Sequence, residues 1–127
     1  MRETHDNVNG APAAIGPYST AVSVGDILYT SGQLPLDPDT GNIVGDDVAT
    51  QAKQSLENLK TIVEALGSNM KNVIKTTIYL TDIDSFLEFN DVYADFFHDS
   101  CPARSCVEVS NLPKGSKIEI EGIALKI

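Results

Sequence analysis

The sequence has few basic residues. Nine lysines and arginines stand against eighteen aspartates and glutamates, which gives a formal net charge of -9 at pH 7. Binding to the phosphate backbone of nucleic acids depends on a basic surface that releases counterions. The composition therefore argues against nucleic acid as a partner.

The chain also lacks long apolar runs and a metal-binding pattern. No segment approaches the roughly 20 apolar residues of a membrane-spanning helix, and the first residues show no apolar signal-peptide core. We therefore expect a cytoplasmic protein without membrane contact. The two cysteines, Cys101 and Cys106, and the two histidines, His5 and His98, do not have the spacing of zinc ligands. We expect no metal and, because an extended path separates the two thiols, no disulfide.

The remaining composition is that of an ordinary globular protein, with 42% hydrophobic residues in 127 positions. A chain of this length can bury its own hydrophobic core. No repeat, low-complexity tract or linker divides it, so we expect one domain over residues 1–127. Flexibility is expected only in residues 1–12.

The first half of the chain predicts two strands and a helix. The turn dipeptide Gly25-Asp26 separates two β-rich segments, 21–24 and 27–31, which favours an antiparallel hairpin. After Asp46 and Asp47, which can cap a helix, apolar residues recur at helical spacing and stop at Gly67. They are Ala52, Leu56, Leu59, Val63 and Leu66.

The second half predicts a strand at 74–80, a helix, and two further strands at 102–109 and from 117 onward. Ser85 and Glu88 have the spacing of a capping box, which favours a helix beginning there. The apolar face of that helix is aromatic, with Phe86, Phe89, Tyr93, Phe96 and Phe97.

This order of elements predicts an α+β fold, in which one mixed sheet carries two helices on a single face. On the last strand, Glu119 and Glu121 share a face with Ile123, Leu125 and Ile127. This mixture is too apolar for water and too charged for a core. We therefore expect subunits to associate over the uncovered face of the sheet.

Arg104 is one of only two arginines, and the other, Arg2, lies near the terminus. Alternation places Arg104, Cys106 and Glu108 on one face of their strand. If this strand neighbours the last one, the guanidinium faces carboxylates. A planar fork of donors suits bidentate capture of a small carboxylate ligand, and the alternative is a structural salt bridge.

Three ordered motifs carry a resemblance to a known family. They are Ala13–Ser19, Tyr29–Gln33, and Pro102–Val109 followed by Leu112-Pro113 and Lys117–Glu121. From about residue 13 to the C-terminus, the chain resembles the reactive intermediate deaminase family, in particular its RidA-type imine and enamine deaminases.

The resemblance implies a chorismate-mutase-like α+β fold, a homotrimer with active sites between subunits, and no cofactor. It also implies hydrolysis of 2-imino acids or their enamine tautomers to 2-oxo acids and ammonia. Arg104 would then bind the substrate carboxylate, and Glu119 would orient the attacking water. The other pocket residues would be Tyr18, Ser31, Gly32, Asn90 and Cys106.

Several alternatives remain open at this point. Glu121 could be the working acid, because it projects to the same side as Glu119, although the motif register favours Glu119. Cys106 could be a nucleophile, but a thiol in a strand is more often a packing residue. Tyr18, Ser31 and Asn90 could also have purely structural roles. Tyr18 could anchor a turn, Ser31 could simply end a strand, and Asn90 could be an ordinary asparagine on the surface of a helix.

The function has alternatives as well. A non-catalytic small-carboxylate-binding or chaperone-like module could use the same Arg104 cleft. A nuclease or translation inhibitor is disfavoured by the acidic composition. The sequence leaves the preferred imine undetermined.

Overall fold

The computed structural model describes residues 1–127 and contains one six-stranded mixed sheet. The spatial order of the strands is β1-β2-β3-β6-β4-β5, and only β4 and β5 pair in parallel. The strands are β1 (Arg2–His5), β2 (Ala21–Val24), β3 (Ile27–Thr30), β4 (Val73–Leu80), β5 (Ala103–Glu108) and β6 (Ile118–Leu125).

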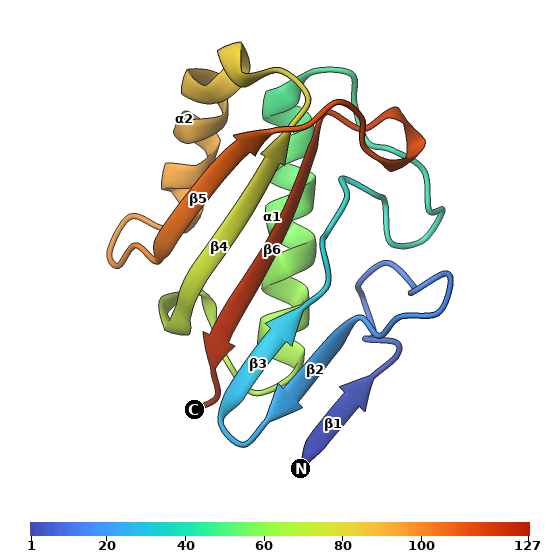
Figure 1. Ribbon diagram of the computed structural model, residues 1–127, viewed down its shortest axis with the longest axis vertical. Coiled ribbons are helices and arrows are strands. Elements are labelled where there is room, and N and C mark those ends of the chain that lie inside the picture. The colour runs from blue at the N-terminus through green and yellow to red at the C-terminus, as the bar shows by residue number, and fades with distance from the viewer.

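Two α-helices, α1 (Val48–Ala65) and α2 (Phe86–Phe96), lie behind the sheet in the view of Figure 1, and none covers its front. Three short 3₁₀ helices join the elements, namely η1 (Met70–Asn72), η2 (Ile83–Ser85) and η3 (Pro113–Gly115). The predicted α+β fold, with both helices on one face, is therefore confirmed. Neither helix is long and apolar enough to cross a membrane.

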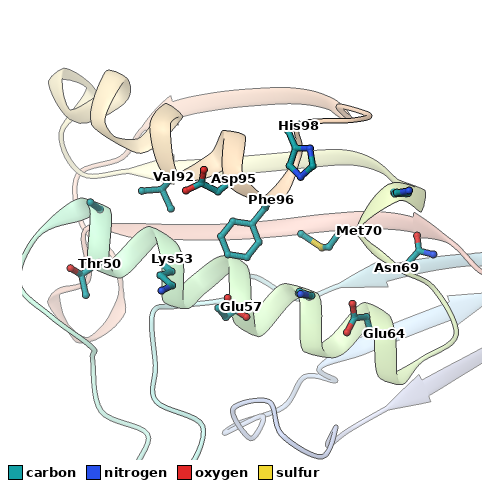
Figure 2. Close-up of a pocket in the computed structure, with 13 residues that line it drawn as sticks. Thr50, Lys53, Glu57, Glu64, Asn69, Met70, Val92, Asp95, Phe96 and His98 are labelled. Atoms are coloured by element: carbon teal, nitrogen blue, oxygen red, sulfur yellow. The ribbon is translucent and has the colours of Figure 1, made fainter.

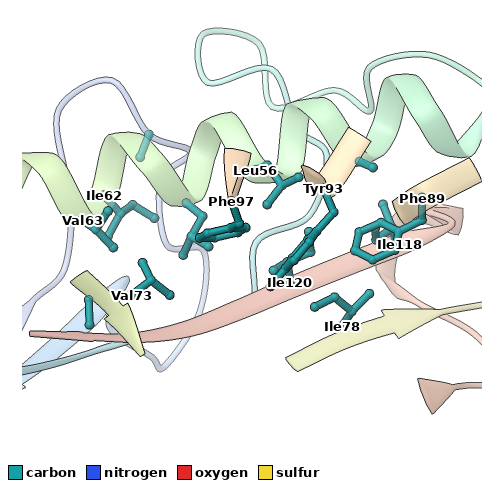
Figure 3. Packing of buried hydrophobic residues seen from close by; sticks show 14 of the residues in the cluster. Leu56, Ile62, Val63, Val73, Ile78, Phe89, Tyr93, Phe97, Ile118 and Ile120 are labelled. Carbon is teal, nitrogen blue, oxygen red and sulfur yellow. The ribbon is translucent and has the colours of Figure 1, made fainter. Parts of the chain in front are cut away.

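The core lies between the helices and the sheet. Ala52, Leu56, Leu59 and Val63 of α1 are fully buried, as the helical spacing predicted. Phe89 and Tyr93 of α2 turn toward the strands, where apolar side chains of β4 and β6 meet them (Figure 3). The Asp47 side chain accepts a hydrogen bond from the backbone N–H of Thr50, so the predicted cap of α1 is present.

The predicted capping box of α2 is wrong. Ser85 makes no capping hydrogen bond, and its hydroxyl donates to the carbonyl of Asp82. The reason is η2, which occupies the residues immediately before α2 and takes Asp82 as its own cap. The chain therefore already turns before α2 begins.

The N-terminal segment, expected to be flexible over residues 1–12, makes specific contacts. Strand β1 pairs with β2, and the Nε2 atom of His5 lies 3.1 Å from the hydroxyl of Ser23. Val8 and Ala11 are buried in the core. The sequence pattern did not indicate this sixth strand, because Arg2–His5 contains no apolar alternation.

The face of the sheet opposite the helices is uncovered and partly apolar. Val24, Tyr29, Val107 and Leu125 are between 39% and 45% exposed, which is high for side chains of this size. Because alternate residues of a strand point to opposite faces, Glu119 and Glu121 share this open face, while Ile118 and Ile120 point to the core.

Candidate functional site

Arg104 lies on β5, at the edge of the sheet, on the face that α2 covers. It pairs with Thr76 of β4, whose buried side chain points to the helices. The Cζ atom of Arg104 lies 4.7 Å from the ring centroid of Tyr93, 5.3 Å from that of Phe86 and 5.7 Å from that of Phe89. The guanidinium therefore rests on the aromatic face of α2.

The expectation that Arg104 faces the carboxylates of the last strand is wrong within one chain. Strand β4 separates β5 from β6, and Glu119 and Glu121 project from the other face of the sheet. Arg104 forms no ion pair, since the only ion-pair contacts in the chain involve His5 and His98. Its five donors are therefore available to an acceptor from outside the chain.

A cavity of about 340 Å³ opens beside this guanidinium. Asn90 lines it together with Arg104, so the structure brings these two predicted residues together. The Oδ1 atom of Asn90 is buried without a hydrogen-bond partner. The remaining lining residues are mainly apolar, namely Tyr93, Ala94, Phe97, Cys101 and Pro102.

Cys106 follows Arg104 on the same face but does not line that cavity. It is half-buried and packs against the hydrophobic core. Burial raises the pKa of the Cys106 thiol, and the positive charge of Arg104 offsets only part of that effect. A thiol that stays protonated fits a packing residue better than a nucleophile.

Glu119 lines a second cavity, of about 460 Å³, on the open side of the sheet. Tyr18, Ser31 and Gly32 line it too, so four predicted residues meet there. A Cβ atom added at Gly32 would overlap the Glu119 carboxylate, with the Cδ atom only 2.7 Å away. Glycine is therefore required here by the close approach of this side chain.

The two glutamates on β6 have different surroundings. Glu119 faces the cavity, whereas Glu121 does not line it and accepts a hydrogen bond of 3.3 Å from the hydroxyl of Tyr79. Burial raises the pKa of Glu119 above its ordinary value of 4.5, and the nearby charge of Glu121 raises it further. Of the two glutamates, only Glu119 therefore lines the cavity.

The hydroxyl of Ser31 donates to the carbonyl of Ser19, so its proton is not free for a ligand. This bond ties the loop that carries Tyr18 to the end of β3. The hydroxyl of Tyr18 accepts from the backbone N–H of Ile15, and the residue is 50% exposed. Its ring is therefore accessible at the mouth of the Glu119 cavity.

The predicted residues thus form two groups. The Arg104 half consists of Arg104 and Asn90, on the helix-covered side at the edge of the sheet. The Glu119 half consists of Glu119, Tyr18, Ser31 and Gly32, on the open side. The cavity of the Arg104 half and the cavity of the Glu119 half share no lining residue.

Sequence reasoning missed two features of these halves. It assigned the aromatic residues of α2 only to packing, although their spacing also places them under Arg104. It did not single out Lys114, which lines the Glu119 cavity and is the only non-glycine residue with positive φ, at 59°. The Nζ atom of Lys114 donates to the carbonyl of Gly41, which ties η3 to the loop before α1.

The largest cavity, about 880 Å³, is the groove between α1 and α2 (Figure 2). It contains none of the predicted site residues. Charged side chains of both signs line it, including Lys53, Glu57, Glu64 and Asp95. This mixture has no convergent acid–base or anion-binding arrangement, so volume alone does not make it the candidate site. No group of three or more His, Cys, Asp or Glu side chains is arranged to hold a metal ion.

Comparisons with known proteins support the family resemblance that the three motifs indicated. Residues 8–126 match the family model described as endoribonuclease L-PSP. A RutC family protein of Pyrococcus horikoshii is 53% identical over 116 residues, which cover 91% of this chain and 92% of the relative. A 2-iminobutanoate/2-iminopropanoate deaminase of Salmonella typhimurium is 52% identical over 119 residues, which cover 91% and 92%.

A solved structure gives the same result for the fold. The crystal structure of E. coli TdcF with bound serine has a TM-score of 0.92 and 44% sequence identity, and the alignment covers 98% of this chain and 100% of that one. The chain therefore belongs to the endoribonuclease L-PSP family, whose members named as deaminases confirm the predicted resemblance to the RidA-type reactive intermediate deaminases.

Proposed function

We propose that this protein hydrolyses reactive 2-imino acids, or their enamine tautomers, to 2-oxo acids and ammonia. The observation that carries the proposal is Arg104, a guanidinium without a protein acceptor in a chain of net charge -9. An unpaired cation beside a cavity suits a small carboxylate. The Salmonella typhimurium relative is named as a deaminase of such substrates, and the TdcF structure carries serine, a small molecule with a carboxylate.

The active site is proposed to lie between subunits of a homotrimer. The Arg104 half and the Glu119 half lie on different sides of one sheet, so each needs a complement from elsewhere. The uncovered, partly apolar face of the sheet offers a surface for association. In this arrangement Arg104 and Asn90 of one protomer meet Glu119, Gly32 and Tyr18 of the next.

Arg104 would hold the substrate carboxylate through two parallel hydrogen bonds. This fixes the position of the neighbouring imine carbon, which is already electrophilic enough for water to attack. The positive charge also opposes the electron-donating effect of the carboxylate. Orientation of the reacting atoms then accounts for a large part of the rate, and no cofactor is required.

Glu119 would position the water and move its proton. As a carboxylate it accepts a proton while the water oxygen bonds to the imine carbon. Glu119 passes this proton to the imine nitrogen, which gives an adduct with one hydroxyl and one amino group. Transfer of the hydroxyl proton through Glu119 to the amino nitrogen then breaks the C–N bond, and the products are the 2-oxo acid and ammonia. A carboxyl group whose pKa is raised by burial is a stronger base when ionised, which favours removal of the proton from water.

The N–H group of Gly32 donates no hydrogen bond within the chain, and Gly32 lies directly beside the Glu119 carboxylate. A free backbone donor at this place would bind a developing negative charge or the substrate carboxylate. We also propose a cytoplasmic location, which fits the two free thiols of Cys101 and Cys106.

The decisive experiment generates 2-iminobutanoate in situ from threonine with a threonine dehydratase and measures 2-oxobutanoate release with and without this protein. Acceleration over spontaneous hydrolysis supports the deaminase. Binding of 2-oxobutanoate without acceleration would instead support the non-catalytic module. Ribonuclease activity that vanished in the Arg104→Ala variant would instead support an endoribonuclease, the activity after which the family is named.

A further inference from the structure

We propose that Tyr93, together with Phe86 and Phe89, is an aromatic support that positions the Arg104 guanidinium in place of a carboxylate counter-ion. The inference rests on the proposed function, because it explains how the carboxylate-binding group is held ready. It concerns positioning residues that act through Arg104.

The geometry of the contact is that of cation–π packing. The Cζ atom of Arg104 lies within 6 Å of the ring centroids of Tyr93, Phe86 and Phe89, at 4.7, 5.3 and 5.7 Å. Guanidinium groups favour aromatic faces because the ring quadrupole attracts the cation while the planar group stacks. Three rings from one helix therefore limit where this side chain can lie.

The support is itself fixed. The hydroxyl of Tyr93 lies 2.7 Å from the Oγ1 atom of buried Thr76, and the Tyr93 ring centroid lies 5.3 Å from that of Phe89 and 4.7 Å from that of Phe97. Tyr93 is only 7% exposed. Because Thr76 pairs with Arg104 across the two strands, the same pair of strands holds both the cation and its aromatic support.

Rings and carboxylates have different consequences for a binding site. A carboxylate partner would occupy two donors of the guanidinium and neutralise its charge, whereas a ring face uses neither. Helix α2 carries Glu88, Asp91 and Asp95, yet Arg104 pairs with none of them. The aromatic side of α2 thus leaves the donors and the charge of Arg104 to an incoming anion.

The test compares the Tyr93→Leu variant, which removes the ring, with Tyr93→Phe, which removes only the hydroxyl. Binding of 2-oxobutanoate is measured by calorimetry on the assembled protein. We expect the dissociation constant to rise about tenfold in Tyr93→Leu and less than twofold in Tyr93→Phe. Should Tyr93→Leu fail to fold, Phe86→Leu at the half-buried ring carries the same test, with an expected rise of about threefold.

A second readout does not depend on turnover. The chain has only two arginines, so its spectrum of arginine Nε–H groups contains two resonances, and an Arg2→Lys variant assigns them. We expect ring currents to displace the Arg104 resonance from that of Arg2 in the wild type and in Tyr93→Phe. Loss of the ring in Tyr93→Leu, or of one ring in Phe86→Leu, should move it toward the Arg2 position.

The outcomes separate this inference from the proposed function. If the Arg104 resonance is displaced in the wild type and moves when a ring is removed, the aromatic support is confirmed even if no imine is hydrolysed. An undisplaced Arg104 resonance in the wild type would overturn it, and so would a folded ring-deletion variant that bound 2-oxobutanoate as tightly as the wild type.

Discussion

The two halves of the proposed site are built in opposite ways. The Arg104 half is formed by regular secondary structure, with the cation on β5 against the rings of α2. The Glu119 half combines one strand residue with loops, since Tyr18, Ser31 and Gly32 lie outside the strands. One half presents a guanidinium on regular secondary structure, and the other holds a carboxylate in a cavity shaped by loops.

This difference suggests a division of labour. The rigid half suits the invariant part of the substrate, its carboxylate. The loop-lined half suits the variable part, because loop side chains such as Leu34 and Leu36 can differ without disturbing the core. Substitutions in each half test this division of labour.

The largest effect is expected for Arg104→Ala. Loss of the bidentate anchor should lower kcat/KM on the order of a thousandfold, because binding and orientation both depend on it. The measurement is 2-oxo acid release from imines generated in situ, and Arg2→Ala is the matched control. Retained turnover in Arg104→Ala would remove the carboxylate-anchor role.

The second prediction tests whether the two halves belong to different protomers. Arg104→Ala and Glu119→Gln subunits, each nearly inactive alone, are unfolded together and reassembled in equal amounts. If each site takes Arg104 from one subunit and Glu119 from the next, about a quarter of the sites should be intact. Recovery of turnover in the mixture would demonstrate shared sites, and its absence would place both halves in one protomer.

The third prediction separates the two glutamates of β6. Glu119→Gln should lower kcat about a hundredfold, the contribution of a general base, whereas Glu121→Gln should change it less than threefold. Turnover should rise with pH as Glu119 loses its proton, with the midpoint of the acid limb above the ordinary carboxyl pKa of 4.5.

The pH profile of kcat/KM supplies the check on that assignment. Glu121→Gln removes a neighbouring negative charge, so it should lower the pKa of Glu119 and move the acid limb to lower pH. Glu119→Gln should abolish the limb. A profile that keeps its acid limb in Glu119→Gln but loses it in Glu121→Gln would reverse the two roles.

Gly32→Ala should have a smaller effect, a loss of turnover of about tenfold to thirtyfold. The added Cβ overlaps the Glu119 carboxylate, so the side chain must move away from its place in the cavity. Gly122→Ala on β6 is the matched control, since its Cβ would meet Leu59 at an ordinary 3.4 Å. Equal turnover in Gly32→Ala and the wild type would show that the position of Glu119 is not critical.

The smallest effect is expected for Cys106→Ala. Burial keeps this thiol protonated, and the side chain does not line the cavity of Arg104, so turnover should change less than threefold. A hundredfold loss in Cys106→Ala would restore the nucleophile hypothesis.

Much of the fold could be predicted from local sequence patterns. The apolar spacing from Ala52 to Leu66 predicted α1, because tertiary packing selects the same stripe that the sequence shows. Strand β1 was missed because its stability comes from pairing with β2 and not from its own side chains. The false capping box at Ser85 shows that a short motif cannot reveal a preceding 3₁₀ turn.

The sequence indicated candidate residues for the site but not their arrangement in space. The scarcity of arginine indicated Arg104, and the position of Glu119 in the Lys117–Glu121 motif indicated Glu119. The order of the strands, in contrast, depends on pairing between segments that are far apart in the sequence. The parallel contact of β4 with β5 inserts a strand between these two residues. Alternation along each strand predicts which residues share a face, but not which face meets the helices.

Strand β4 lies between the strand of Arg104 and the strand of Glu119, so one protomer does not bring these two residues together. This separation affects how a mutation is inherited. If neighbouring protomers complete each other's pockets, then a cell that carries one damaged gene copy and one intact copy builds mixed assemblies. A defective Arg104 then silences a pocket whose other residues come from the intact allele. One damaged copy at this residue therefore silences the pockets that draw on its product, about half of them, however freely the two products assemble with each other.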